Sequence, residues 1–206
     1  NYRKELDIGV LLGDRGVVIH TGSYKGKYED GISLVGEALT KVLTQPSSIP
    51  ESKDEKFRLR RRVLIENCAG EGTKLGKTLE EVRDIINSVP KKLRRQISIC
   101  IDTAHIFGAG QYNFGKPEEV KKFFSDFNDI IGLNKLEVIH LNDSKVPFGL
   151  KKDRHENLGR GHQFRGGGGL IELYKLCDKY AIPMILETPG NGILEDLFIL
   201  NSIATT

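Results

Sequence analysis

The feature that most constrains the fold of this 206-residue chain is a recurring unit in which a short apolar run ends at a polar side chain. One run, ISICI at residues 97–101, is followed by Asp102, and His105 stands three residues later. Four other runs end in the same way, at His20, Glu66, His140 and Glu187. Short apolar runs between turn residues are typical of buried strands. The sequence therefore predicts five strands whose ends each present a potential metal ligand.

Helical patterns separate these strands. Thr78 and Glu81 form a capping box before an apolar-faced helix at residues 79–87. Pro117 suits the first turn of a helix that should run to residue 131. Further helices are expected at residues 2–12, from a cap at Asp30 or Ser33 to about Thr44, at residues 170–180 and at residues 194–203. A strand-loop-helix unit repeated five times predicts a parallel sheet with helices outside it, in which ligands gather at the carboxyl ends of the strands.

The loops carry three further expectations. Gly132 should end the preceding helix in the left-handed conformation. A long loop is expected at residues 142–169, and its glycine run at residues 166–169 is interpreted as a flexible linker. The basic run at residues 53–62 is interpreted as a solvated approach to a strand.

The length of the chain suits a single domain at residues 1–206. Five strand-helix units do not close an eight-stranded barrel, and the chain begins at Asn1 without an initiator methionine. We therefore expect about three amino-terminal units to be missing from this chain. The formal charge of +3, from 31 basic and 28 acidic residues, is too balanced to indicate nucleic-acid binding by itself.

The three cysteines argue against an extracellular disulfide scaffold. Cys68, Cys100 and Cys177 are odd in number and widely spaced, and no two of them form a CxxC pair. No apolar stretch approaches the roughly 20 residues needed to cross a bilayer, and the start of the chain does not resemble a signal peptide. We therefore expect a soluble intracellular protein.

The candidate ligands mix imidazole nitrogen with carboxylate oxygen. Zinc and manganese accept such mixed sets, whereas magnesium prefers oxygen alone. Asp153 and His155 add an Asp-x-His pair in the long loop, which brings the set to His20, Glu66, Asp102, His105, His140, Asp153, His155 and Glu187. That is more than one metal can use. Each residue alone could be a cap or an ion-pair partner, and His162, the remaining histidine, is interpreted as an ordinary loop residue.

Amide and acid side chains beside these candidates have two interpretations. Asn67 follows Glu66, and Asn142 and Asp143 follow His140 by two and three residues. They could orient the ligands from behind, or they could be turn residues at strand ends.

Three sequence blocks are distinctive, IENCAGEG at residues 65–72, CIDTAH at 100–105 and HLNDSK at 140–145. These blocks resemble the endonuclease IV family of zinc-dependent apurinic/apyrimidinic endonucleases. Three further blocks agree in order, VIHTGS at 18–23, DRHENLGRG at 153–161 and ILET at 185–188. The resemblance spans almost the whole chain and implies a TIM barrel of the (β/α)8 type, of which about five units are present here.

The resemblance also implies a trinuclear zinc cluster, with manganese as a possible substitute. His20 and Glu66 match ligands of the first metal, and Glu66 would bridge to the second. The remaining ligands of the second metal would be Asp102, His140 and Glu187, and those of the third would be His105, Asp153 and His155. A further histidine of the family, on an earlier strand, has no counterpart in this chain.

Two departures from the family pattern are visible. Thr21 stands where a proline usually follows the first histidine, and residues 162–169 are longer and richer in glycine than the pattern. We expect the second departure to loosen a loop that faces DNA.

The implied activity is hydrolysis of the phosphodiester 5′ of an abasic site in double-stranded DNA, which leaves a 3′-hydroxyl. Glu66 and Glu187 are the catalytic candidates, Glu66 as the bridge between two metals and Glu187 as the group that orients the attacking water. The phosphate-contact candidates are Lys145, Lys151, Lys152, Arg154 and Arg160. A monomer is expected.

Two other hypotheses remain open. A xylose-isomerase-like sugar isomerase or epimerase would also place Glu, Asp and His at strand ends, but it would use one or two metals rather than three. A catalytically inert DNA-binding or structural fragment is the other alternative.

Overall fold

The computed structural model describes residues 2–46 and 62–205. Within these ranges five strands form one parallel sheet in the order β1-β2-β3-β4-β7. They are β1 (Val17–His20), β2 (Val63–Glu66), β3 (Ile97–Asp102), β4 (Leu136–His140) and β7 (Met184–Ile185). Spatial order follows chain order, as in successive units of an α/β barrel. Apart from Arg62, the basic run expected at residues 53–62 lies outside the described residues.

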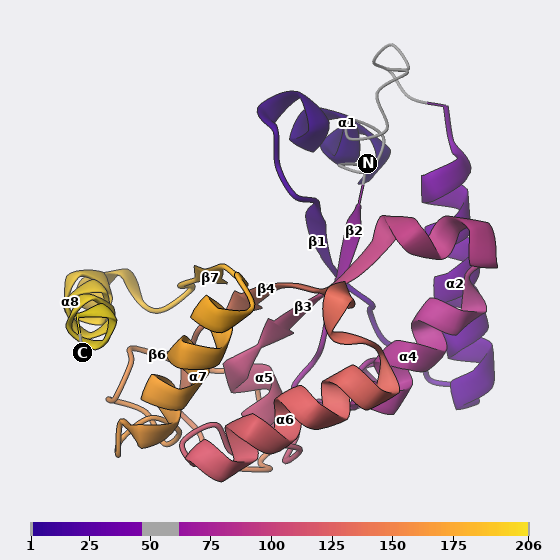
Figure 1. The fold of residues 1–206 in the computed structure, drawn as a ribbon. Coiled ribbons are helices and arrows are strands. Elements are labelled where there is room, and N and C mark those ends of the chain that lie inside the picture. The colour runs from indigo at the N-terminus through magenta and orange to yellow at the C-terminus, as the bar shows by residue number, and fades with distance from the viewer. Residues whose placement is uncertain (1, 47–61, 206) are drawn as a thin grey trace.

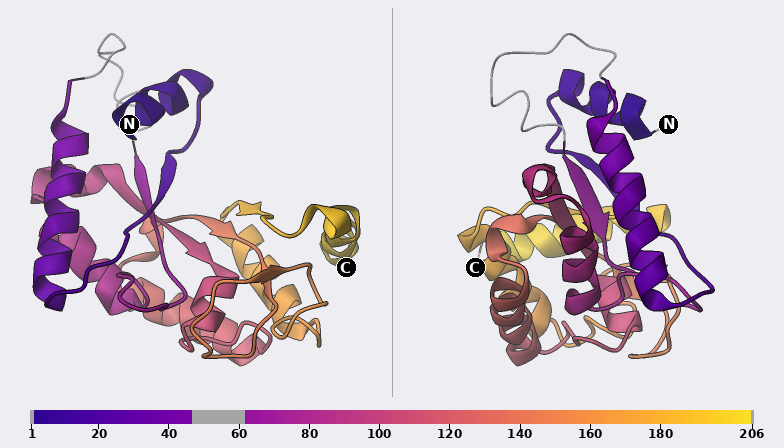
Figure 2. Two further views of the ribbon diagram at one scale, coloured as in Figure 1. Left: turned by 180° about the vertical axis from the view of Figure 1, so that it is seen from behind. Right: turned by 90° about the vertical axis from the view of Figure 1, so that its right-hand side faces the viewer.

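Helices alternate with these strands. They are α1 (Tyr2–Leu12), α2 (Tyr28–Thr44), α4 (Leu79–Ser88), α5 (Thr103–Gly108), α6 (Pro117–Ile130), α7 (Gly168–Lys179) and α8 (Ile193–Ala204), with 3-10 turns η1 (Lys91–Gln96), η2 (Leu133–Lys135) and η3 (Gly190–Gly192). Helices α2, α4, α6 and α7 follow one another along one face of the sheet (Figure 1). Figure 2 shows that α1 and α8 lie at opposite ends of the sheet, so the two termini are far apart. No helix in the described part of the chain is long and apolar enough to cross a membrane.

The two faces of the sheet bury different side chains because successive residues of a strand point in opposite directions. The helix-covered face carries residues such as Ile65, Ile99 and Ile139, which join the large apolar core against the helices. The opposite face carries a small separate cluster of Leu64, Cys100 and Val138, with Val18 packed against it. In a closed barrel with helices outside, this second face would line the inside.

The sequence predicted the starts of α4 and α6 correctly and that of α2 wrongly. Thr78 caps α4, since its hydroxyl oxygen accepts a hydrogen bond from the backbone N–H of Glu81 at 3.2 Å. In contrast, α2 begins at Tyr28, after Lys27, whose side chain makes no capping bond. Asp30 and Ser33 therefore lie inside α2 rather than capping it, and Asp30 adds negative charge to its first turn, where the helix dipole favours an anion.

The expected loops are more ordered than predicted. Residues 142–169 contain an antiparallel pair, β5 (Asp143–Ser144) with β6 (His155–Glu156). The glycine run is not a flexible linker, because Gly168 and Gly169 begin α7. A Cβ added at Gly169 would lie 1.9 Å from the carbonyl oxygen of Phe114, so this position is tightly packed. Gly132 has the positive φ of 101° that its predicted role after a helix requires.

Candidate metal centre

The pleat of the strands builds the candidate site directly above the small inner cluster. Side chains two residues apart on a strand point to the same face. On each strand the residue two positions beyond the inner-cluster side chain therefore points to the same face as that side chain. These residues are all polar: His20, Glu66, Asp102 and His140. They come together because parallel strands end at the same edge of the sheet, with His20 paired to Glu66 and Asp102 paired to His140 in register.

The helix α5, which was not foreseen from the sequence, places His105. Asp102 caps α5, since its Oδ1 accepts a hydrogen bond from the backbone N–H of His105 at 2.9 Å. Asn67 holds the same corner, because its Oδ1 accepts from the backbone N–H of Asp102 at 2.7 Å. The backbone carbonyl of Asn67 lies 3.0 Å from Nδ1 of His105. Asp102 thus has both the capping role and a position in the candidate site.

The short pair β5–β6 brings in Asp153 and His155. The backbone N–H of Asp153 donates to Oε1 of Glu71 at 3.0 Å, which ties this loop to the one after β2. Glu187 lies two residues beyond the end of β7 rather than on the expected strand. Its backbone N–H donates to Oδ1 of Asn142 at 3.0 Å.

Asn142 and Asp143 have different roles. Asn142 also donates from Nδ2 to Oδ2 of Asp102 at 2.7 Å, so it supports two candidate ligands from behind. Asp143 is fully buried and accepts backbone N–H groups of the following loop at 2.7–3.3 Å; the donors are Ser144, Gly159, Gly161, Gln163 and Phe164. This anchoring orders the start of the stretch at residues 162–169, where we had expected a loosened loop.

The eight candidates form one connected network of imidazole and carboxylate groups. Glu66 lies 3.1 Å from Nε2 of His20 and 3.3 Å from Nδ1 of His140, and Glu187 lies 3.1 Å from the same Nδ1. Asp153 lies 3.1 Å from Nε2 of His105 and 3.3 Å from Nε2 of His155. Oε1 of Glu66 lies 3.4 Å from Nδ1 of His105 and so joins the two halves of the network. Oδ2 of Asp102 lies 3.4 Å from Nε2 of His155.

Within this network the donor atoms gather into groups with the spacing that a metal ion needs. In one group Glu66, Asp102, His140 and Glu187 each offer an atom within 4.8 Å of the others. These four are the set that the family resemblance assigns to the second metal. A second group holds Asp102, His105 and His155, while Asp153 contacts both histidines of that group.

The donor set fits a cation with borderline-soft character. Nε2 of His105 and Nε2 of His155 are buried and make no well-aligned hydrogen bond to any described residue. Both nevertheless face carboxylate oxygens at 3.1–3.4 Å. Buried polar atoms normally have partners, so ring nitrogens and carboxylates that converge in this way are a donor set suited to zinc or manganese.

Burial and mutual charge shift the titration of the network. Burial alone would lower the pKa of His105, but the carboxylates of Asp102 and Asp153 raise it to about 9. Close contacts with the imidazoles of His105 and His155 hold the pKa of Asp153 far below its usual range. The contact with His140 lowers the pKa of Glu187, whereas burial raises the pKa of Asp102. The pKa values of His140 and His155 are raised as well, so their neighbouring carboxylates favour the protonated imidazoles.

The predicted phosphate contacts are exposed, and most of them share one loop. The loop between β5 and β6, which also contains Asp153, carries four of them: Lys145, Lys151, Lys152 and Arg154. Lys151 has the unusual φ of 54°, and its backbone N–H donates to the carbonyl of Gly108 at 2.8 Å. Arg160 lies outside this loop, 3.9 Å from Glu195 of α8.

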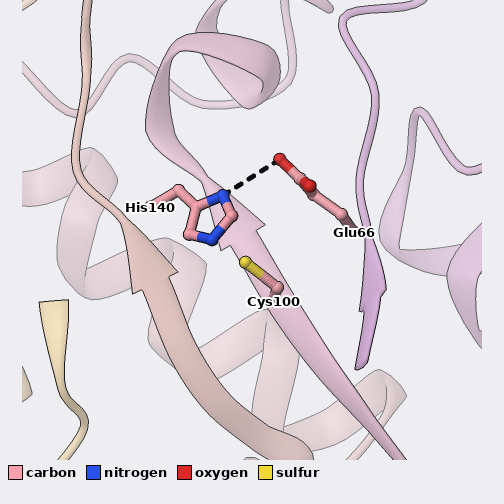
Figure 3. Close-up of side chains that lie close together, drawn as sticks. All are labelled: Glu66, Cys100 and His140. Atoms are coloured by element: carbon pink, nitrogen blue, oxygen red, sulfur yellow. Dashed lines mark hydrogen bonds and ion pairs between the residues drawn. The ribbon is translucent and has the colours of Figure 1, made fainter. Parts of the chain in front are cut away.

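Two residues at the site were missed in the sequence. Glu71 accepts the backbone N–H of Asp153, a long-range contact that no local pattern indicates. Cys100 is fully buried and lies beside His140 and Glu66, as Figure 3 shows. The alternation of Ser98, Cys100 and Asp102 along β3 was a signal that could have placed Cys100 on the face of the site.

Comparisons with known proteins agree with this architecture. The model of the xylose isomerase-like TIM barrel family matches residues 1–196. A protein of Carboxydothermus hydrogenoformans named "Probable endonuclease 4" is 37% identical over 188 residues, which are 91% of this chain and 60% of that protein. The "Probable endonuclease 4" of Halothermothrix orenii is 37% identical over 204 residues, covering 98% of this chain and 67% of that protein.

Solved structures give the same result. The crystal structure of endonuclease IV from Thermus thermophilus superposes with a TM-score of 0.75 at 28% identity, over 99% of this chain and 65% of that one. A D-tagatose 3-epimerase-like protein superposes with a TM-score of 0.68 at 17% identity, which shows a shared fold alone. The fold and the site define a xylose isomerase-like TIM barrel. Within that class, the chain belongs to the endonuclease IV family. It spans about 60% of the length of the first curated relatives that it matches.

Proposed function

We propose that this chain provides the metal centre of a DNA-repair endonuclease that hydrolyses the phosphodiester 5′ of an abasic site and leaves a 3′-hydroxyl. The observation that carries this proposal is the convergence of Glu66, Asp102, His140 and Glu187 within 4.8 Å, beside a separate group formed by Asp102, His105 and His155. Two adjoining groups suit a site with more than one metal. The chain would act as one domain and as a monomer, inside the cell, on double-stranded DNA.

The proposed ligands divide among three zinc ions, with manganese as a possible substitute. His20 and Glu66 would hold the first, Glu66 with Asp102, His140 and Glu187 the second, and His105, Asp153 and His155 the third. Such ions supply charge neutralisation at the phosphate and a lowered pKa for the attacking water.

The side chains of this chain contribute orientation and charge. Glu66 is only 3% exposed and lies between His20 and His140, which suits a bridging carboxylate. Glu187 is 44% exposed in its side chain, and its lowered pKa keeps the carboxylate charged at the mouth of the site. It can therefore accept a hydrogen bond from a water molecule next to the phosphate. The exposed Lys145, Lys151 and Lys152 would hold the flanking phosphates.

Selection of an abasic site would follow from the low cost of turning out a sugar that has no base. A baseless nucleotide loses little stacking when it leaves the duplex, and bending the DNA exposes it further. This supports an abasic substrate over an intact one.

Incision of a duplex that contains one abasic analogue tests the proposal. We expect a cut 5′ of the lesion that a chelator abolishes and zinc restores, with an end that a DNA polymerase can extend. Both this chain and the full reading frame that encodes it are assayed. Cleavage that resists the chelator, or no cleavage by the full reading frame, would refute the proposal.

The two alternatives give different results in the same experiment. Tight binding of the abasic duplex with full zinc occupancy but no incision would favour the inert DNA-binding fragment. A sugar isomerase would bind one or two metals rather than three. Counting bound zinc in this chain and in the full reading frame therefore separates that alternative from the nuclease.

A further inference from the structure

Cys100 lies at the base of the candidate metal centre, where the register of the sheet brings it next to two proposed ligands. In the β2–β3 pair Cys100 stands opposite Glu66, whereas in the β3–β4 pair it stands opposite Val138. A register shift between Ile99 and Cys100 accompanies this arrangement. Cys100 is thus level with Glu66 on one side and one pleat below His140 on the other.

The sulfur atom of Cys100 lies next to the imidazole of His140 (Figure 3). Nδ1 of His140 lies 3.3 Å from Glu66 and 3.1 Å from Glu187. The other ring nitrogen lies beside the sulfur of Cys100 (Figure 3). A donor atom of each of Glu66, Cys100 and His140 lies within 4.8 Å of the others.

A histidine that binds a metal through one nitrogen usually donates its second N–H to a fixed acceptor, which sets the tautomer and the orientation of the ring. Carboxylates and backbone carbonyls are the common acceptors. Here the residue in that place is a thiol, a weak acceptor, in a position that is fully buried among Leu64 and Val138. Water, the usual competitor for a weak hydrogen bond, is excluded from such surroundings.

We propose that Cys100 is a positioning residue that accepts the Nε2–H of His140 and so holds the ring with Nδ1 aimed at Glu66 and Glu187. This inference rests on the proposed metal centre. It assigns no metal bond to the sulfur atom, although that atom lies within 4.8 Å of donor atoms of Glu66 and His140.

Zinc titration of the purified protein, in competition with a chromophoric chelator, tests this role without DNA. We expect Cys100→Ala to weaken zinc binding at one site by about 10- to 100-fold, as loss of such supporting partners does elsewhere. Cys100→Ser retains an acceptor oxygen and should bind zinc within about threefold of the parent, because the imidazole keeps its support. A protein that binds zinc in this way but does not cut abasic DNA would refute the proposed function and leave this inference standing.

Cys177 of α7 offers a matched control, because it is equally buried and its pKa is shifted by burial alone. Cys177→Ala should lose stability as a buried thiol does but keep the zinc affinity of the parent. Equal losses of zinc affinity in Cys100→Ala and Cys177→Ala would overturn the proposal, because the effect would then be structural. If Cys100→Ala does not fold, weak zinc binding by Cys100→Ser would overturn it in the same way.

Cobalt(II) in place of zinc separates an orienting thiol from a thiolate ligand. A thiolate bound to cobalt(II) gives an intense near-ultraviolet charge-transfer band, whereas nitrogen and oxygen ligands do not. We expect the parent protein to lack this band. A band that Cys100→Ser removes would overturn the proposal, because the sulfur would then be a ligand itself.

Discussion

Single side chains decide whether the candidate centre can form, and Glu66 has the most contacts with other candidates. Its two carboxylate oxygens lie 3.1–3.4 Å from ring nitrogens of His20, His105 and His140. It comes from an interior strand of the sheet and is almost completely buried.

Glu66→Gln should reduce abasic-site incision by more than about 100-fold, because a neutral amide cannot bridge two metals and order the attacking water. Glu80→Gln, on the exposed surface of α4, is the control and should retain full activity. Initial rates at saturating duplex, with zinc content measured on the same samples, check this result. Retained activity in Glu66→Gln would argue against the bridging role.

Glu71 acts on the site through a backbone contact. Its Oε1 accepts the N–H of Asp153, and its Oε2 pairs with Lys74 at 2.6 Å. Glu71→Ala should therefore weaken zinc binding by about 10-fold at the site that Asp153 would form, since Asp153 loses its support. Glu71→Gln keeps an acceptor oxygen and should stay near the parent.

Lys74→Ala separates the two contacts of Glu71, because it removes the ion pair and leaves the bond to Asp153. We expect it to bind zinc as the parent does. Chelator competition on all three variants measures the difference. If Lys74→Ala were as weak as Glu71→Ala, the ion pair rather than the backbone contact would be responsible.

At the scale of the elements, tight backbone packing fixes the start of α7. Gly169→Ala would place a Cβ 1.9 Å from the carbonyl oxygen of Phe114 and 2.5 Å from the carbonyl carbon of Gly115. A rigid backbone cannot move away as a side chain can, so we expect a loss of about 1–3 kcal/mol in the free energy of unfolding. Denaturant titration measures it. Gly166→Ala, with open space around its Cβ, is the control and should change stability little.

The loop between β5 and β6 presents the basic residues that we assign to DNA. Alanine at Lys145, Lys151 and Lys152 together should lower the slope of log affinity against log salt by about 2.7, if each contacts one phosphate. Fluorescence anisotropy with an abasic duplex at several salt concentrations gives this slope.

Lysines near the amino ends of the strands provide the control for this triple variant. Lys91 and Lys92 lie in η1, immediately before β3, and Lys41 lies in the last turn of α2. All three are exposed. Their triple replacement by alanine should leave the slope unchanged. An equal decrease in both variants would mean that the basic loop is not the DNA-binding surface.

The elements also show which features a sequence can predict. The apolar runs predicted all five strands of the parallel sheet, because a buried strand is a local pattern. Thr78 could be predicted as a cap because its partner Glu81 is three residues away. The start of α7 was predicted wrongly, since nothing local shows that Gly169 is packed against Phe114. The pair β5–β6 was missed for the same reason, because residues far apart in the sequence form it. Helix α5 was missed because it has only 6 residues, although its cap, Asp102, is local.

At the scale of the whole molecule, the candidate ligands were predictable because the sheet is parallel and its strands all end at one edge. The hydrogen bonds that support these ligands from behind were not predictable. Asn142 supports Asp102, which is 40 residues away, and Glu71 supports Asp153, which is 82 residues away. The centre therefore links every strand of the sheet, and its occupancy should influence the stability of the whole fold.

The pH dependence of stability should differ between metal-free and zinc-loaded protein. The pKa of His105 is raised from 6.5 to about 9 in the folded protein, and the pKa values of His140 and His155 are also raised. A raised folded-state pKa contributes stability that is complete below pH 6.5 and is lost as the pH rises through the folded-state value. The metal-free melting temperature should therefore fall between pH 6.5 and about 9.

Zinc requires these same histidines without their protons, so its affinity should rise over the same pH interval. A ligand that binds only the folded state stabilises it by about 2.7 kcal/mol at about 100 times its Kd. The difference in melting temperature between zinc-loaded and chelator-treated protein should therefore widen from pH 6.5 to about 9, as differential scanning fluorimetry would show. His162→Ala, at an exposed position away from the network, should leave both profiles unchanged. A metal-free profile that is flat or rises with pH would show that the histidines do not carry the protons that balance their carboxylates.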